Sequence, residues 1–110
     1  MARASDGRLH FKSISGEHLY VVAYDIGEPR RWRRVFKLMN GYGEWLQLSV
    51  FQCRLTRRRR AELAAALNGL INHNQDHVLI LDLGCVERVD LRVLSLGKTY
   101  EPVVREPIIV

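Results

Sequence analysis

One acidic residue stands at the end of a run that is otherwise typical of a buried strand. Asp25 lies at the end of the sequence HLYVVAYDI (residues 18–26), which is rich in β-branched and aromatic residues. A charge in that position is costly unless it meets water, a partner or a metal ion. Mg²⁺ is usually held in proteins by one or two carboxylates together with water and substrate phosphate. We therefore take Asp25 as the candidate catalytic and metal-binding residue. A cap or turn role before the next helix is the alternative.

A single Asp25 per chain makes an incomplete magnesium site. The two-fold axis of a homodimer would supply a second carboxylate from the other protomer. We expect one Mg²⁺ shared between the two Asp25 side chains, where the ion would activate water for attack on a phosphodiester. The metal site and the dimer are therefore one hypothesis.

Clustered arginines point to a ligand that carries phosphate. The net charge is +5, and the planar guanidinium matches phosphate oxygens better than an ammonium does. The first cluster, at residues 30–34, is explained equally well as the solvated face of a helix. The second cluster, at residues 57–60, lies at the start of a helix, where positive charge is opposed by the helix dipole. A bound phosphate would offset this repulsion. The alternative is that an exposed helix end tolerates it. The expected nucleic-acid-binding residues are Arg30, Arg31, Arg33, Arg34, Arg57, Arg58, Arg59 and Arg60.

Length and composition predict one small domain in a reducing, cytoplasmic setting. The chain has 110 residues, of which 47% are hydrophobic, enough for a modest core without metal or disulfide staples. Cys53 and Cys85 lie far apart and form no CxxC pair, and the four histidines show no metal-ligand spacing. No cysteine–histidine nucleophile pair stands out. Neither a membrane span nor a secretory signal is visible, so no membrane partner is expected.

The chemistry-bearing residues need a scaffold, and the apolar periodicity predicts a ferredoxin-like α+β fold. The expected order is βαββαβ, an antiparallel sheet with both helices on one face. The first helix begins at Pro29 and stops near Gly41, and Thr56 caps the second. We expect a leader at 1–17 followed by a single domain at 18–110. The expected strands are at 18–26, 44–48, 49–55 and 77–83. A C-terminal extension (84–110), with extended segments at 91–97 and 102–110, is expected to provide an edge strand.

This topology leaves one face of the sheet without helices. The first strand is central and apolar on both faces, so a symmetric homodimer packed sheet against sheet is the simplest cover. The segment 102–110 could then add to the partner's sheet. Ser49 opens a strand antiparallel to the first and is a polar neighbour of Asp25, or else a turn serine. Asp82 should emerge at the opposite end of the sheet and is left out of the site.

Two stretches of the sequence, VVAYDI and RRVFKLMNGYGEWLQLSVFQCRL, resemble the CRISPR-associated protein two family, the small adaptation subunit of CRISPR immune systems. The resemblance covers residues 18–83. It implies a ferredoxin-like homodimer that bridges copies of the CRISPR integrase and helps to capture new spacer DNA. It also implies metal-dependent nuclease activity on RNA or DNA.

The same resemblance assigns roles to individual residues. The family's metal-binding aspartate matches Asp25 and its preceding tyrosine matches Tyr24. Phe51 matches the phenylalanine of its SVF motif, and its helix arginines fall near Arg31 and Arg34. The leader and the RRRR run at 57–60 depart from the family pattern. A stand-alone toxin-like endoribonuclease of the same fold remains the alternative function, whereas an RNA-recognition module would need exposed stacking aromatics on the third strand.

Overall fold

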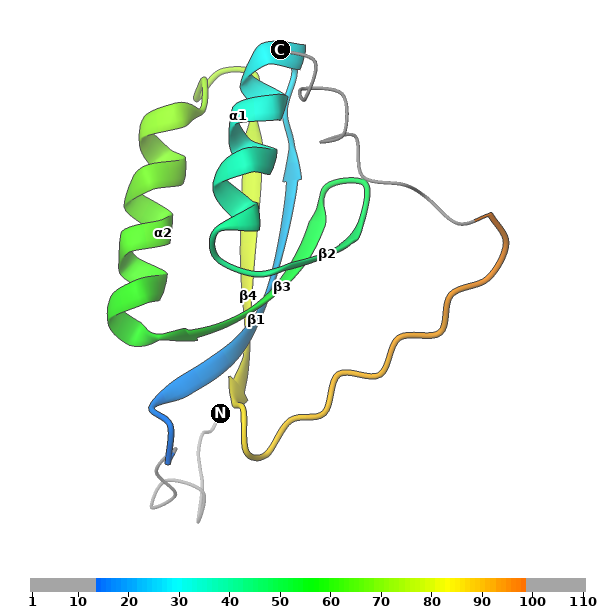
Figure 1. The fold of residues 1–110 in the computed structure, drawn as a ribbon. Helices are drawn as coiled ribbons and strands as arrows, with labels where there is room; N and C mark the ends of the chain where they lie inside the picture. The colour runs from blue at the N-terminus through cyan, green and yellow to red at the C-terminus, as the bar shows by residue number, and fades with distance from the viewer. Residues whose placement is uncertain (1–13, 99–110) are drawn as a thin grey trace.

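Four antiparallel strands and two helices make up the fold seen in a computed structural model, which describes residues 14–98 (Figure 1). The order is the predicted ferredoxin-like βαββαβ, and both helices lie against the same face of the sheet. Neither helix in this part of the chain has the length and apolarity needed to cross a membrane. The elements are β1 (Glu17–Asp25), α1 (Pro29–Asn40), β2 (Glu44–Gln47), β3 (Val50–Thr56), α2 (Arg57–Leu70) and β4 (His77–Cys85).

The central place of β1 follows from its composition. The strand order is β2-β3-β1-β4, so β1 is paired on both sides and needs a residue type that tolerates burial along its whole length. Tyr20, Val22 and Tyr24 alternate toward the helices and are buried. The opposite alternation, Val21 and Ala23, faces away from them. The prediction that β1 is central and apolar on both faces is confirmed.

Helix α1 begins and ends where its sequence predicts. The Glu28 side chain accepts a hydrogen bond from the Arg31 backbone N–H at 2.7 Å, and Pro29 occupies the first turn, where no backbone donor is needed. Gly41 caps the carboxyl end. The apolar stripe packs on the sheet through its buried residues Val35, Phe36 and Met39.

The connection from α1 to β2 leaves no space for a side chain at Gly43. A Cβ atom there would collide with Cys53 Sγ and with the Gln52 carbonyl oxygen. Cys53 is 1% exposed, so it is a core residue. The close approach of backbone to β3 explains why glycine follows the helix.

Helix α2 is held by its cap and by one apolar edge. Thr56 Oγ1 accepts a hydrogen bond from the Arg59 N–H at 3.1 Å, which confirms the predicted cap. Leu63 and Leu67 are buried against the sheet. The helix runs antiparallel to α1, since it starts at the end of the sheet where β3 finishes.

The two ends of the chain differ in part from the prediction. β1 begins at Glu17, and the Ser15 N–H donates to Glu87 at 3.0 Å, so the described end of the predicted leader contacts the domain. Residues 91–97 form no strand with the rest of the described chain and run away from the sheet (Figure 1). The other predicted segment, 102–110, and residues 1–13 lie outside the described residues.

Candidate functional site

Asp25 is the last residue of β1 and is exposed. Strand alternation places it on the face away from the helices, because its neighbour Tyr24 points into the core. Within residues 14–98 its carboxylate takes part in no hydrogen bond or ion pair. A charged group at the end of a buried strand, with no partner among the described residues, can bind a ligand without first breaking an internal contact.

A histidine lies directly across from Asp25. The antiparallel register pairs Asp25 with His77, the first residue of β4, and both are exposed. Directly paired residues have Cβ atoms roughly 4.5–5.5 Å apart and point to the same face. The histidine spacing gave no sign of this neighbour, because only the register of β1 on β4 brings the two residues together. Its imidazole could serve as a further ligand beside the carboxylate.

Tyr24 and Ser49, predicted as neighbours of the site, lie next to each other. The Tyr24 N–H donates to the Ser49 carbonyl oxygen at 3.1 Å. The Ser49 hydroxyl accepts from Trp32 Nε1 at 2.9 Å, so it is directed to the helix face and away from Asp25. Ser49 therefore lies beside the end of β1 as expected, but its hydroxyl is bound to Trp32.

The Tyr24 side chain is a buried polar group at the centre of this region. Burial raises the pKa of Tyr24 well above its ordinary value, and the nearby Ser49 hydroxyl offsets the effect only in part. No well-formed hydrogen bond reaches the phenolic oxygen from any described residue. Tyr24 is therefore neutral near pH 7 and holds the end of β1 by packing.

Phe51 belongs to the same packed group and not to a binding surface. It is fully buried, and its ring lies 6.4 Å from that of Tyr24 and 5.5 Å from that of Phe36. This burial also confirms that β3 lacks the exposed stacking aromatic of an RNA-recognition module. Phe51 supports the strand end that carries Asp25.

The turn between β2 and β3 contains a strained residue, Leu48, immediately before Ser49. Leu48 has a φ of 37°, which is unfavourable for a residue with a branched side chain. The Trp45 Nε1–H donates to the Leu48 carbonyl at 3.0 Å and fixes this conformation. Such strain persists when surrounding contacts demand it and is frequent near functional sites.

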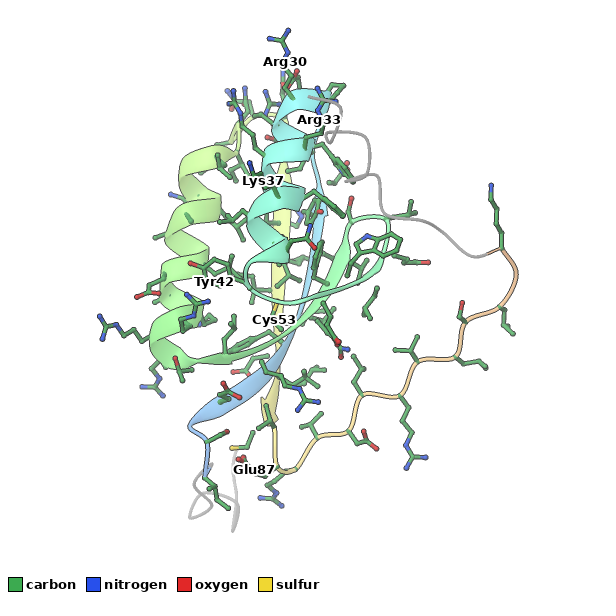
Figure 2. The ribbon with its side chains drawn as sticks, viewed as in Figure 1. Arg30, Arg33, Lys37, Tyr42, Cys53 and Glu87 are labelled. Carbon is green, nitrogen blue, oxygen red and sulfur yellow. The ribbon has the colours of Figure 1, made fainter. Side chains whose placement is uncertain are left out.

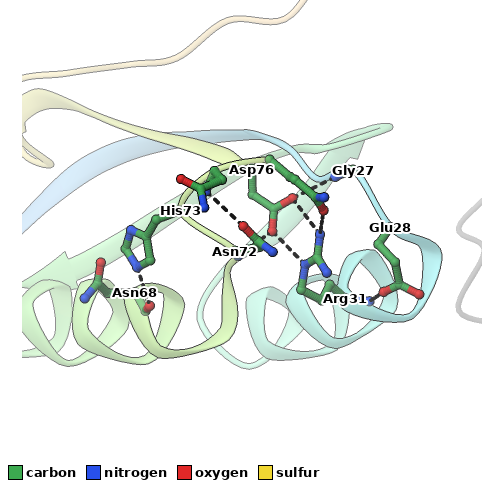
Figure 3. Close-up of polar contacts among 9 residues, drawn as sticks. Gly27, Glu28, Arg31, Asn68, Asn72, His73 and Asp76 are labelled. Carbon is green, nitrogen blue, oxygen red and sulfur yellow. Dashed lines mark hydrogen bonds and ion pairs between the residues drawn. The ribbon is translucent and has the colours of Figure 1, made fainter.

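Asp76 ties together the turn after β1 and the loop after α2, as Figure 3 shows. Its carboxylate accepts from the backbone N–H groups of Gly27 at 2.8 Å and Asn72 at 2.7 Å. Arg31 Nε donates to the same carboxylate at 2.8 Å. The Asp76 side chain is 0% exposed, so these donors replace its water. The network fixes the turn between β1 and α1.

The charge of Asp76 depends on these donors. The hydrogen bond from Arg31 holds the pKa of Asp76 well below its ordinary range, against the opposing effect of burial, and the backbone N–H groups of Asn72 and Gly27 add to it. The Arg31 side chain is 19% exposed and also donates to Gln75 at 2.9 Å. The role of Arg31 in nucleic-acid binding stays a prediction, and its contacts with Asp76 and Gln75 are those of a structural residue. The polar sequence NHNQD at 72–76 is the signal for this network, but the sequence pattern alone predicts only a loop there.

The other cations of α1 point away from the sheet. Arg30, Arg33, Arg34 and Lys37 are exposed and form no ion pair within residues 14–98. Figure 2 shows Arg30, Arg33 and Lys37 on this helix. Helix α1 follows β1 after a short turn, so its first turns carry a positive surface near the end of β1 that holds Asp25. Arginines without an internal ion pair can contact phosphate without first breaking a bond.

The arginines of α2 lie at the other end of the sheet. The register pairs Glu17 with Thr56, and Asp25 lies eight residues farther along β1, about 26 Å at the usual rise of a strand. Arg58 and Arg59 both pair with Glu62, at 3.4 and 3.6 Å. A further feature that offsets their repulsion is the ring of Tyr42, over which the Arg59 guanidinium lies at 4.3 Å.

One chain supplies only part of a metal site. No group of three or more histidine, cysteine, aspartate or glutamate side chains that could hold an ion occurs among the described residues. The Asp25 carboxylate fits an ion that takes most of its ligands from water, phosphate or a second protomer. Asp82, at the far end of β4, is paired with Tyr20, which confirms that it lies away from Asp25.

The chain matches the family model described as CRISPR associated protein Cas2 over residues 18–89. It is 60% identical over 94 residues to "CRISPR-associated endoribonuclease Cas2" of Geobacter sulfurreducens, covering 86% of this chain and 99% of that protein. It is 58% identical over 96 residues to "CRISPR-associated endoribonuclease Cas2 1" of Rhodospirillum rubrum, covering 87% and 94% of the two chains.

Solved structures agree in fold. A hypothetical protein from Thermus thermophilus superposes with a TM-score of 0.66 at 35% identity, covering 78% of this chain and 100% of that one. The Cas2 protein of Streptococcus pyogenes superposes with a TM-score of 0.64 at 30% identity, covering 72% and 99%. The similarity therefore extends over about three quarters of this chain and nearly the full length of these relatives.

Proposed function

Because the chain belongs to the CRISPR associated protein Cas2 family, we propose that it acts as a homodimeric nucleic-acid-binding subunit in CRISPR adaptation. In this role it bridges copies of the CRISPR integrase while new spacer DNA is captured. We further propose that it cleaves phosphodiester bonds of RNA or DNA at Asp25 with Mg²⁺. The curated relatives carry the name endoribonuclease, which supports the second part.

The observation that carries the proposal is the position of Asp25 at the rim of an apolar surface. On the face without helices, the register sets Val21 beside Leu81 and Ala23 beside Leu79, and the next pair in the row is Asp25 with His77. A two-fold axis through this face would bury the leucines and bring two Asp25 residues toward each other. The same packing would complete the cover of the sheet and the ligand set of the ion.

The residues around Asp25 have separate roles in this proposal. Two Asp25 carboxylates would hold the Mg²⁺, which supplies an activated water and neutralises charge on the phosphate. The Asp76 network keeps the turn after Asp25 in place. Arg30, Arg33 and Arg34 would bind phosphates next to the site, so that the nucleic acid is held as a polyanion and not by its base sequence.

Cleavage is tested with Asp25→Asn, which removes the charge and keeps the size. Purified protein is incubated with single-stranded RNA and with duplex DNA in Mg²⁺ and, separately, in chelator. We expect cleavage by the native chain in Mg²⁺ only and none by Asp25→Asn. The matched control is Asp90→Asn, at an exposed carboxylate paired with Arg92 outside the sheet, which should cleave normally. Full activity of folded Asp25→Asn would refute the catalytic role.

Binding is tested separately, because a scaffold needs no cleavage. Duplex affinity is measured over a range of salt for the native chain and for the triple alanine variant of Arg30, Arg33 and Arg34. The slope of log K against log salt should fall by about 0.9 for each phosphate that the variant no longer neutralises. An unchanged slope would remove α1 from the binding surface. The same comparison with alanine at Arg57, Arg58, Arg59 and Arg60 tests the second cluster, whose role in adaptation fails if both affinity and integration are unchanged.

A further inference from the structure

A cysteine, a histidine and an aspartate meet at the end of the sheet opposite Asp25. His18 Nδ1 lies 2.9 Å from Asp82 Oδ1 and 3.1 Å from Oδ2. The other ring nitrogen, His18 Nε2, lies 3.7 Å from Cys85 Sγ. None of these three residues belongs to the proposed nuclease site. The order thiol, imidazole, carboxylate is the arrangement that activates cysteine nucleophiles.

The strands hold this group in place. His18 is paired with Cys85 across β1 and β4, after a register shift between His18 and Tyr20. The Asp82 carboxylate also accepts from the Gly84 N–H at 2.9 Å. Gly84 has a φ of 109°, a conformation that favours glycine, and it sets the direction of the chain just before the cysteine. The His18 ring is stacked on Tyr20 at 6.1 Å.

These contacts determine which ring nitrogen of His18 can accept the thiol proton of Cys85. An ionised carboxylate only accepts hydrogen bonds, so His18 Nδ1 carries a hydrogen toward Asp82. In the neutral ring, Nε2 then presents its lone pair to the Cys85 sulfur. The imidazole can take the thiol proton, and the carboxylate stabilises the imidazolium that forms. His18 and Asp82 are positioned to assist the thiol, and only Cys85 would form a covalent bond.

The other cysteine gives an internal reference. Cys53 lies in the core, and burial raises the pKa of its thiol to about 11. Cys85 is only partly buried, and its partners His18 and Asp82 have side chains 39% and 52% exposed. A small molecule can therefore approach Cys85 but not Cys53. A reactive thiol needs this combination of a proton acceptor and access.

We propose that Cys85 is a thiol-exchange site that forms a mixed disulfide with low-molecular-weight disulfides. The Cys85 S–H bond breaks as its proton moves to His18 Nε2, and the sulfur attacks one sulfur of the small disulfide. The S–S bond of that molecule breaks, and its leaving thiolate receives the proton from the imidazolium. Cys85 is oxidised and the leaving sulfur is reduced, so no other oxidant is needed.

The position of Cys85 gives the adduct a defined place in the molecule. Cys85 ends β4, and the next residue, Val86, donates its N–H to the Glu17 carbonyl at 3.0 Å. The adduct therefore forms where the chain leaves the sheet toward residues 91–97. It lies at the end of the sheet where α2 begins with its arginines, since Glu17 is paired with Thr56.

The test is the rate of mixed-disulfide formation with glutathione disulfide, followed on the full chain by intact-protein and peptide mass spectrometry. We expect one adduct per chain, on Cys85, formed faster in the folded protein than on the same cysteine in the chain unfolded by denaturant. His18→Gln should slow it roughly tenfold or more, since general-base assistance contributes about 10²–10⁴-fold. Asp82→Asn should cause a smaller loss. His73→Gln, in the loop after α2, is the matched control and should have no effect.

Two outcomes would overturn the proposal. One is a Cys85 rate in the folded chain no higher than in the unfolded chain, and the other is a rate unchanged by both His18→Gln and Asp82→Asn. Cys53 is buried, so an adduct on Cys53 shows that a variant has lost its fold. If this happens in His18→Gln, the rate is compared between the native chain and Asp82→Asn instead. Because the assay contains no nucleic acid or metal, its result is independent of the proposed nuclease activity.

Discussion

The apolar face of the sheet allows the dimer to be tested through a single leucine. Leu79 and Leu81 of β4 are 48% and 47% exposed and lie in the row of residues that ends at Asp25. Burying a whole leucine side chain is worth about 1.5–3 kcal/mol. About half of each side chain is already covered, so a dimer would gain about 1 kcal/mol from each copy.

Leu81→Asp should therefore weaken the dimer without unfolding the protomer. Two copies of the substitution remove about 2 kcal/mol of apolar burial, which is roughly a 30-fold rise in the dimer dissociation constant. The true loss is larger, because two carboxylates would be desolvated near the axis. Sedimentation velocity over a concentration series measures the shift, and circular dichroism checks that each protomer is folded.

The control for this prediction is Leu48→Asp. Leu48 is 52% exposed, close to the value for Leu81, but it lies in the turn between β2 and β3 and not in the row of paired leucines. This variant should dimerise like the native chain. A native dissociation constant in folded Leu81→Asp, or a native chain that stays monomeric at every concentration, would show that this face is not the interface.

Three further predictions concern the stability of the scaffold. Asp76→Asn should lower the melting temperature at neutral pH. The pKa of Asp76 is lower in the folded protein than its unfolded value of 3.8, so the native carboxylate stabilises the fold above that value. This stability is lost as the pH falls from 3.8 through the folded pKa. The melting temperatures of the native protein and the variant should therefore converge as the pH is lowered. Gly43→Ala should cost about 1–3 kcal/mol in urea denaturation, since its Cβ would meet Cys53 and Gln52; an unchanged midpoint would contradict the close contact. Leu48→Gly should be neutral or stabilising by up to about 1 kcal/mol in the same assay because it relieves the positive φ, and a clear loss of stability would contradict the strain.

Much of the fold is contained in local patterns. The first strand, the bounds of α1 and the cap at Thr56 each depend on neighbours within a few residues, and all three predictions are confirmed. The extended segment expected at 91–97 is in no strand of the described protomer, because strand-like composition creates a strand only where a partner strand is within reach, and its pairing in a dimer stays a prediction. Within the described part of one protomer, this segment has no such partner strand.

The candidate site was predictable only in part, since it depends on contacts between distant segments. Asp25 stood out as a charge in an apolar run, and the nearness of Ser49 followed from the antiparallel order. His77 and Asp76 were missed because the register and the loop contacts that bring them to this end are set by tertiary packing. For the same reason the sequence showed no link between Cys85 and His18.

The most direct test of the shared metal site is a crystal structure of the protein with Mn²⁺ in place of Mg²⁺, with anomalous scattering used to locate the ion. We expect one ion per dimer on the two-fold axis, with the two Asp25 carboxylates bound to it directly or through water. The ion should be absent from Asp25→Asn crystals prepared in the same way. Two Asp25 residues on opposite sides of the dimer, or an ion that persists in Asp25→Asn, would contradict a metal site shared across the two-fold axis.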